Sequence, residues 1–176
     1  MNDMVMKTAG ALLLLIGTTA FGVYKGCLYN NRLDNLYEVK KAFLYIQGEI
    51  RYMNTPIPET LESAACRING RCRQFFARVA EELNSGKGAE LKQVWETNIS
   101  REIHGELLER EAVEALREMG GQLGCLDMQA QEKAIDYFLK KWDDLIEKRR
   151  KEKAEKLKLY YVCGIMGGLL MVIIIV

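Results

Sequence analysis

The fold is decided by the stretch from Asp127 to Val176, DMQAQEKAIDYFLKKWDDLIEKRRKEKAEKLKLYYVCGIMGGLLMVIIIV. It contains no proline, and its first glycine is Gly164, so the sequence predicts one near-continuous helix. Its first third carries apolar residues at spacings of three, four and three, namely Ile135, Phe138, Trp142 and Leu145. This spacing places them on one helical face, which we expect to pack in the core of a domain formed by the preceding residues.

The same stretch then becomes basic and finally apolar. Residues 148–158 have a net charge of +5, since Glu152 and Glu155 are set against seven cations: Lys148, Arg149, Arg150, Lys151, Lys153, Lys156 and Lys158. The 18 uncharged residues 159–176 would span about 27 Å as a helix, close to the roughly 30 Å hydrocarbon core of a bilayer. We therefore interpret residues 159–176 as a transmembrane helix. The basic residues are interpreted as a membrane-surface cluster that contacts lipids, rather than as a site for nucleic acid.

A second uncharged run, residues 8–24, lies between Lys7 and Lys25. It resembles either a signal peptide cleaved near Ala20 or an uncleaved anchor. We favour the anchor because the run continues to Tyr24. The predicted organisation is an N-terminal segment with a transmembrane helix (1–26), a helical domain (27–158) and a C-terminal transmembrane helix (159–176). The basic run lies on the domain side of the second span, so the positive-inside tendency predicts a cytoplasmic domain in the cell membrane.

Small residues mark possible helix contacts within the two spans. Thr18 and Gly22 form a small-xxx-small pair, and Gly164 and Gly168 form GxxxG. Either each pair packs against another helix, or glycine is simply frequent in membrane helices. Both interpretations stay open, and with them a possible homo-oligomer.

The 176 residues carry a net charge of +1, five cysteines and a single histidine. The odd cysteine count without CxxC favours a reducing compartment and no disulfide framework. We expect Cys66 and Cys72 to pack as small hydrophobic residues and His104 to face solvent, although Glu102 and Glu106 lie near it in the sequence. Nothing else predicts a catalytic group, so we expect a protein that is not an enzyme, with no metal and no cofactor.

The chain between the two spans predicts an all-α bundle of six helices and no strand. Apolar residues recur every three or four positions in the first predicted helix, residues 28–53: Leu36, Val39, Phe43, Ile46, Ile50 and Met53. Thr55 is expected to cap the second helix with Pro56 at its first position, and that helix should stop at 69–70. A third helix passes through 75–83 and a fourth through 91–99.

The fifth predicted helix runs over residues 106–119, with a turn at 120–124 and Asp127 as the cap of the last helix. Residues 102–118 contain six glutamates against Arg110 and Arg117, a net charge of −4. We interpret this acidic face as a solvated helix surface. A docking face for a basic partner is the alternative.

Several segments, taken together and in order, resemble the stage III sporulation protein AB family of endospore-forming bacteria. They are the N-terminal span, the segment Arg51 to Leu61 (RYMNTPIPETL), the turn Gly121 to Gly124 (GQLG) with Asp127 and Gln131 after it, and the closing segment Tyr161 to Ile174 (YVCGIMGGLLMVII). Five turn or cap positions match the family and are possible partner contacts: Thr55, Pro56, Gly124, Asp127 and Gln131.

The resemblance implies a non-enzymatic membrane adaptor of the apparatus that links the mother cell to the forespore. Its fold would be similar to the cytoplasmic domains of inner-membrane platform proteins, and it would couple a cytosolic secretion-type ATPase to ring-forming membrane partners in the outer forespore membrane. One alternative is a platform protein of a type II secretion or type IV pilus machine, which normally has two domains and three spans. Another is a membrane-tethered helical scaffold unrelated to secretion.

Overall fold

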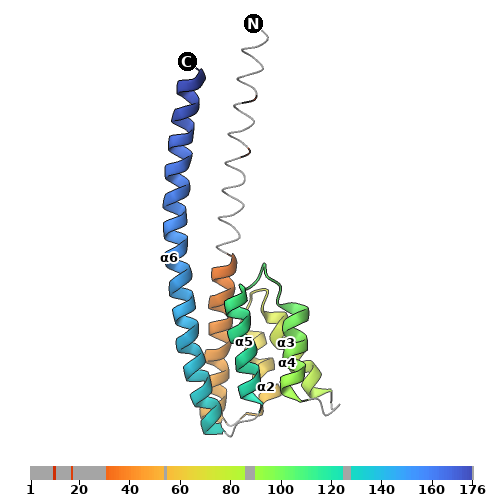
Figure 1. Cartoon of the computed structure of the whole chain (residues 1–176). Helices are drawn as coiled ribbons and strands as arrows, with labels where there is room; N and C mark the ends of the chain where they lie inside the picture. The colour runs from red at the N-terminus through yellow and green to blue at the C-terminus, as the bar shows by residue number, and fades with distance from the viewer. Residues whose placement is uncertain are drawn as a thin grey trace. The chain divides into compact units, whose positions relative to one another are not determined.

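The computed structural model describes residues 31–53, 55–85, 90–124 and 129–155 with their side chains, the helical backbone of 128 and 156–175, and the isolated positions Gly10 and Gly17. Within these residues there are six helices and no strand, so the predicted all-α class is confirmed (Figure 1). The helices are residues 31–53, α2 (Ile57–Arg67), α3 (Arg73–Asn84), α4 (Leu91–Glu102), α5 (Arg110–Leu123) and α6 (Met128–Ile175).

The chain divides into two compact units. One is the helical bundle Asn31–Lys148, and the other joins Met1–Asn30 with Arg149–Val176. Among the described residues, no helix combines the length and the apolar character needed to cross a bilayer. The two predicted spans fall outside the side chains that the structure describes, and so do the predicted packing positions Thr18 and Gly22.

The helix over residues 31–53 forms one wall of the bundle. Its predicted apolar face is buried at Leu36, Val39, Phe43, Ile46 and Ile50, as the spacing indicated. The prediction is wrong for Met53, which is 70% exposed. Arg51 already pairs with Glu132 in the first turns of α6, so Met53 lies at the end of the bundle, beyond the core.

Aromatic rings from four helices meet in the centre of the core. The Phe43 ring lies 5.8 Å from Phe76, 6.3 Å from Trp95 and 4.3 Å from Phe138, measured between centroids. Trp142 stacks on Phe138 at 4.9 Å. Each such pair contributes about 0.5–1.5 kcal/mol beyond the free energy gained from burying its surface. The cluster therefore stabilises the packing of helix 31–53, α3, α4 and α6 against one another.

The first part of α6 packs antiparallel to helix 31–53. Trp142 Nε1 donates to the Leu36 carbonyl over 2.8 Å, and further along Gln47 Nε2 donates to Asp136 Oδ1 over 2.6 Å. The predicted apolar face of this helix, Ile135, Phe138, Trp142 and Leu145, is buried. The expected long final helix is therefore confirmed in its backbone, and the packing of its first part is confirmed as well.

The predicted start of the second helix is wrong in its capping. Thr55 does not cap α2, because its Oγ1 donates to Glu49 Oε2 over 3.1 Å instead of accepting from a helix amide. Pro56 stands one position before the helix, where its carbonyl accepts the Thr60 amide over 3.0 Å. Pro58 occupies the first turn, where a missing N–H costs nothing.

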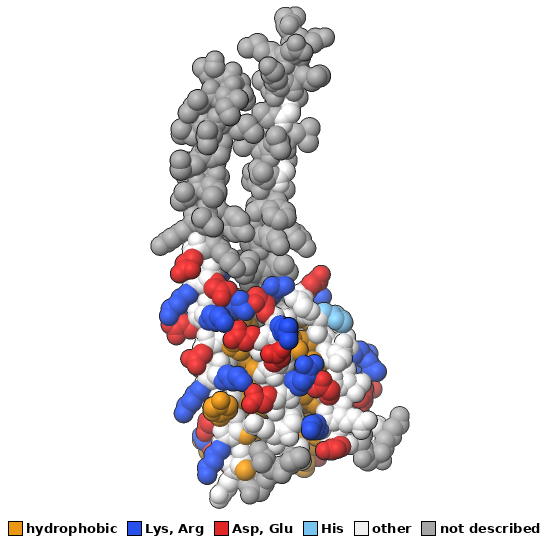
Figure 2. Space-filling model, in the orientation of Figure 1, with side chains coloured by type: hydrophobic (Ala, Val, Ile, Leu, Met, Phe, Trp, Pro, Cys, Tyr) orange, Lys and Arg blue, Asp and Glu red, His pale blue; other side chains and the backbone are white. Residues whose placement is uncertain are grey.

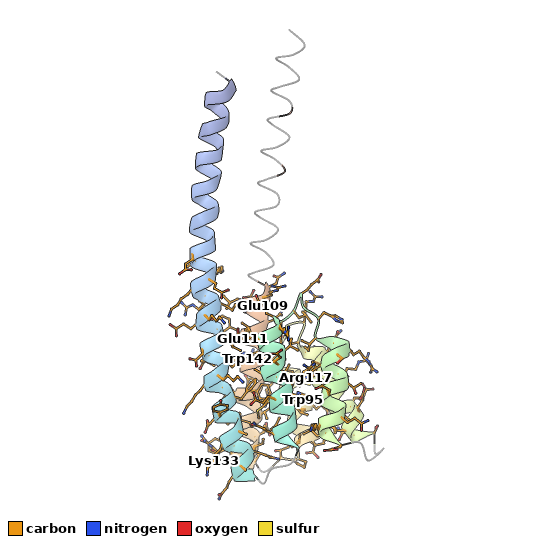
Figure 3. All side chains as sticks on the ribbon, viewed as in Figure 1. Trp95, Glu109, Glu111, Arg117, Lys133 and Trp142 are labelled. Carbon is orange, nitrogen blue, oxygen red and sulfur yellow. The ribbon has the colours of Figure 1, made fainter. Side chains whose placement is uncertain are left out.

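The predicted fifth helix is displaced. It begins at Arg110 rather than Glu106, because Leu107 and Leu108 are buried in the turn before it. It also continues through Gly120 and Gly121, which were expected to form a turn. A Cβ on Gly120 would lie 2.0 Å from Cδ1 of Trp95, which is labelled in Figure 3. This glycine therefore permits close packing of α5 on α4 instead of ending the helix.

Candidate functional site

Charged side chains of both signs are interspersed on the face of the bundle shown in Figure 2. The acidic face over residues 102–118 is part of this surface. Its glutamates form salt bridges, several of them with cations of neighbouring helices. Glu111 pairs with Lys148 over 2.8 Å and Glu118 with Lys141 over 2.7 Å, both joining α5 to α6. The hydrogen bond to Glu118 raises the pKa of Lys141.

Three further glutamates of this face are also paired with arginines. Glu109 accepts from Arg32 over 3.3 Å, Glu102 lies 3.8 Å from Arg78, and Glu114 pairs with Arg110 within α5. Each exposed pair contributes only about 0.2–1 kcal/mol. These contacts neutralise most of the net negative charge of residues 102–118, so little charge remains to attract a basic partner. This supports the interpretation of the acidic face as a solvated helix surface.

The predicted basic cluster is partly used within the chain. Lys148 binds Glu111, and Arg149 Nη1 lies 2.7 Å from Glu152 Oε2. Arg150 and Lys151 are exposed, and Lys153 is half-buried. The side chains of Lys156 and Lys158 lie outside the described residues, although their backbone belongs to α6.

The turn positions that match the family have structural contacts. Gln131 Nε2 donates to the Leu123 carbonyl over 3.0 Å, which satisfies an end group of α5 and fixes the corner into α6. The Cα of Gly124 faces Leu91, since a Cβ there would lie 3.4 Å from the Leu91 Cβ. Asp127, the expected cap of the last helix, lies outside the described residues. Gly164 and Gly168 lie in the backbone of α6, and their expected packing is not described.

Two side chains at the start of helix 31–53 form hydrogen bonds with the turn between α4 and α5. The sequence did not predict this contact. Arg32 Nη2 donates to the Gly105 carbonyl over 2.7 Å, and Asn35 Nδ2 donates to the Leu107 carbonyl over 3.0 Å. His104 in this turn is exposed, as expected. No group of three or more histidine, cysteine, aspartate or glutamate side chains in the described part of the chain could hold a metal ion.

The two described cysteines differ in environment. Cys72 is fully buried, and burial raises its pKa from 9.0 to about 12. Cys66 is exposed, so the expectation that it packs as a small hydrophobic residue is wrong. It lies on the outward side of α2, whose buried residues include Ala64 and Ala65.

This difference predicts selective thiol labelling. In a full-length chain with Cys27, Cys125 and Cys163 replaced by serine, iodoacetamide at pH 8 should modify Cys66 and leave Cys72 unmodified. The shift to about 12 lowers the Cys72 thiolate fraction about 1000-fold, and burial blocks access as well. Peptide mass spectrometry would measure both sites, with urea-unfolded chain as the control. Equal labelling of both cysteines in the folded chain would contradict the assignment.

The geometry defines an all-helical bundle whose last helix also enters the second unit. The sequence model described as stage III sporulation protein AB (spore_III_AB) matches residues 7–176. The chain therefore belongs to the stage III sporulation protein AB family.

Two known proteins agree with this assignment. Stage III sporulation protein AB of Bacillus subtilis (strain 168) is 22% identical over 171 residues, which covers 97% of this chain and 99% of the relative. A solved structure of stage III sporulation protein AB (SpoIIIAB) matches with a TM-score of 0.64 at 21% identity, covering 71% of this chain and 98% of the solved one. The latter shows a shared fold.

Proposed function

We propose that this chain is a non-enzymatic membrane adaptor in sporulation. Its helical domain lies in the mother-cell cytoplasm, and its two apolar runs anchor it in the outer forespore membrane. The partners are membrane lipids, a cytosolic ATPase of the secretion type, and ring-forming membrane proteins of the same complex. The family supports the role in sporulation, and the adaptor role and its partners are what the resemblance to that family implies.

The observation that carries this proposal is the continuity of α6. This helix runs for 48 residues from Met128 to Ile175. Trp142 and its apolar neighbours fix the first part in the bundle core, and the uncharged residues 159–175 make up the last part. No proline interrupts the helix, and no glycine precedes Gly164. Such a helix transmits a push or a rotation, because sharp kinks arise almost only at proline, glycine or a bulge.

The basic cluster has a defined part in this proposal. The cluster would contact anionic headgroups where α6 enters the bilayer, each cation that reaches the surface contributing roughly 1 kcal/mol. This contact would fix the depth of the helix. Motion imposed on the bundle would then act on proteins in the plane of the membrane.

Breaking α6 tests the proposal. Insertion of Gly-Gly-Pro after Glu152 should abolish the formation of heat-resistant spores, because proline in a helix interior costs about 3 kcal/mol or more and introduces a kink. The variant should still fold and reach the membrane, as measured by protease resistance of the bundle and by resistance to carbonate extraction. Residue 152 lies outside the bundle Asn31–Lys148, so the insertion does not directly disturb the packing of the bundle.

The matched control is an insertion of seven alanine-rich helical residues at the same place. Seven residues lengthen the helix by about 10 Å and change its facing by only about 20°. This variant should sporulate. Normal sporulation of the Gly-Gly-Pro variant would refute rigid coupling through α6.

A further inference from the structure

Three arginines stand apart from the others in the bundle. Residues 31–148 contain nine arginines, of which six pair with carboxylates: Arg32, Arg51, Arg78, Arg101, Arg110 and Arg117. The remaining three are Arg67, Arg71 and Arg73, and none of them has a salt bridge to a described residue. All three are exposed, and they follow one another around the corner between α2 and α3. This corner therefore concentrates an excess of positive charge that is not in salt bridges with the described residues.

The corner lies against helix 31–53. The Arg67 guanidinium carbon is 5.1 Å from the centroid of the Tyr45 ring, and the Asn69 amide donates to Glu38 Oε2 over 3.1 Å. A Cβ on Gly70 would lie 2.8 Å from Glu38 Cγ, so this glycine allows the close approach. Glu38 is the carboxylate beneath the corner; it keeps its negative charge when it accepts the Asn69 amide, so the three arginines exceed it in charge.

A stripe follows the outward side of helix 31–53 beside this corner, with three exposed side chains and with Lys41 and Gly48 half-buried. It consists of Tyr37, Lys41, Leu44, Gly48 and Tyr52, at spacings of four, three, four and four. Tyr37 is 43% exposed, Leu44 48% and Tyr52 80%. A Cβ on Gly48 would meet nothing within 4 Å, so there is open space in the middle of the stripe.

The spacing of this stripe is that of a helix-pairing seam. Positions 37, 41, 44 and 48 follow the four-three-four repeat of a heptad, and the core residues occupy the opposite face. A partner helix laid along it would pack on Tyr37 and Leu44 and approach the backbone at Gly48. Exposed apolar surface rimmed by charge is typical of protein interaction sites.

We propose that the stripe and the arginine corner together dock an amphipathic helix of a partner protein, with an apolar seam and carboxylates along one flank. Lys41, Arg67 and Arg71 supply the complementary charge, and arginine binds carboxylates through two parallel hydrogen bonds. Pairing of this face with the same face of a second copy would place these cations near one another, and they would repel. A lipid surface would make no use of the heptad spacing.

This inference deepens the proposed function by naming the surface through which the adaptor holds a partner. A photo-crosslinking residue replaces Leu44 in the full-length chain in sporulating cells, and the matched control replaces Tyr137, which is 60% exposed on α6. Position 44 should give an adduct that maps to a helical segment with apolar residues at spacings of three and four and with Asp or Glu on its flank. Position 137 should give no such adduct.

Charge reversal then tests the arginines. Arg67→Glu with Arg71→Glu should lower partner affinity about 10-fold or more, seen as lost crosslinking from position 44. Arg110→Glu, at another exposed arginine, should not. Replacing the facing carboxylates of the partner segment by lysine should restore the crosslink to the reversed chain. An unchanged unfolding midpoint shows that the variants are folded.

Several outcomes would overturn the inference. They are an adduct with a second copy, with lipid or with a basic segment, no adduct at all, or crosslinking that survives the double charge reversal. The chain with Gly-Gly-Pro after Glu152 retains the stripe and the corner, so it should still crosslink from position 44. Failure of the docking surface and failure of coupling through α6 are thus distinguished by separate measurements.

Discussion

Replacement of Gly120 by alanine is expected to destabilise the bundle by about 1–3 kcal/mol, because it overpacks a filled core. The new Cβ would lie 2.0 Å from Trp95 Cδ1 and 2.3 Å from Trp95 Cγ. The indole cannot easily move away. It packs edge-on against Phe75 at 4.9 Å, and its Nε1 donates to the Leu116 carbonyl over 2.9 Å. A shift of α5 would therefore also lose this buried hydrogen bond, at a further cost of about 1–3 kcal/mol.

The adjacent glycine provides the control. Gly121 lies in the same helix, and a Cβ there would meet nothing within 4 Å. Gly121→Ala should stabilise the chain by about 0.5–1 kcal/mol, because glycine in a helix interior costs this much relative to alanine. Urea unfolding of the full-length chain in detergent, followed by helical circular dichroism, would measure both. Equal effects of the two substitutions would contradict the close packing of α5 on Trp95.

Replacement of Trp142 by alanine is expected to cost about 3–5 kcal/mol, a large part of the 5–15 kcal/mol that stabilises a typical domain. The indole is fully buried, stacks on Phe138 and donates to the Leu36 carbonyl (Figure 3). Its loss leaves a cavity between α6 and helix 31–53. The bundle should then unfold at lower urea, and the proteolysis of residues 31–148 should increase.

Two further variants separate the causes. Trp142→Phe keeps most of the volume and loses the hydrogen bond, so it should cost about 1–2 kcal/mol. Tyr137→Ala, at an exposed position of the same helix, should change stability by no more than about 0.5 kcal/mol. If Tyr137→Ala destabilised the chain as much as Trp142→Ala, the assignment of the buried face of α6 would be wrong.

Periodic features of the sequence predicted the structure well. Ile135, Phe138, Trp142 and Leu145 are buried because the spacing of apolar residues alone determines which face of a helix packs inward. The same reasoning located α3 and α4 and the interruption at His104. These predictions depend on neighbours within one segment, which a single sequence contains.

Features that depend on contacts between segments were not predicted. Gly120 looks like a helix breaker until the Trp95 indole of another helix is placed against it. Thr55 looks like a helix cap in the sequence, but in the structure its hydroxyl donates a hydrogen bond to Glu49 instead. The acidic residues 102–118 were interpreted as a solvated surface, but the sequence did not reveal that Lys141 and Lys148 of α6 pair with them. Arg67, Arg71 and Arg73 could be distinguished from the other six arginines of the bundle only once the structure showed which arginines form salt bridges.

The hydrogen bond between Trp142 and Leu36 joins positions 106 residues apart. At a synthesis rate of about 5–20 residues per second, roughly 5–20 seconds separate the appearance of these two residues at the ribosome. During that interval the apolar side of helix 31–53 lacks the indole that later covers it. The core between helix 31–53 and α6 is therefore completed only after translation has reached α6.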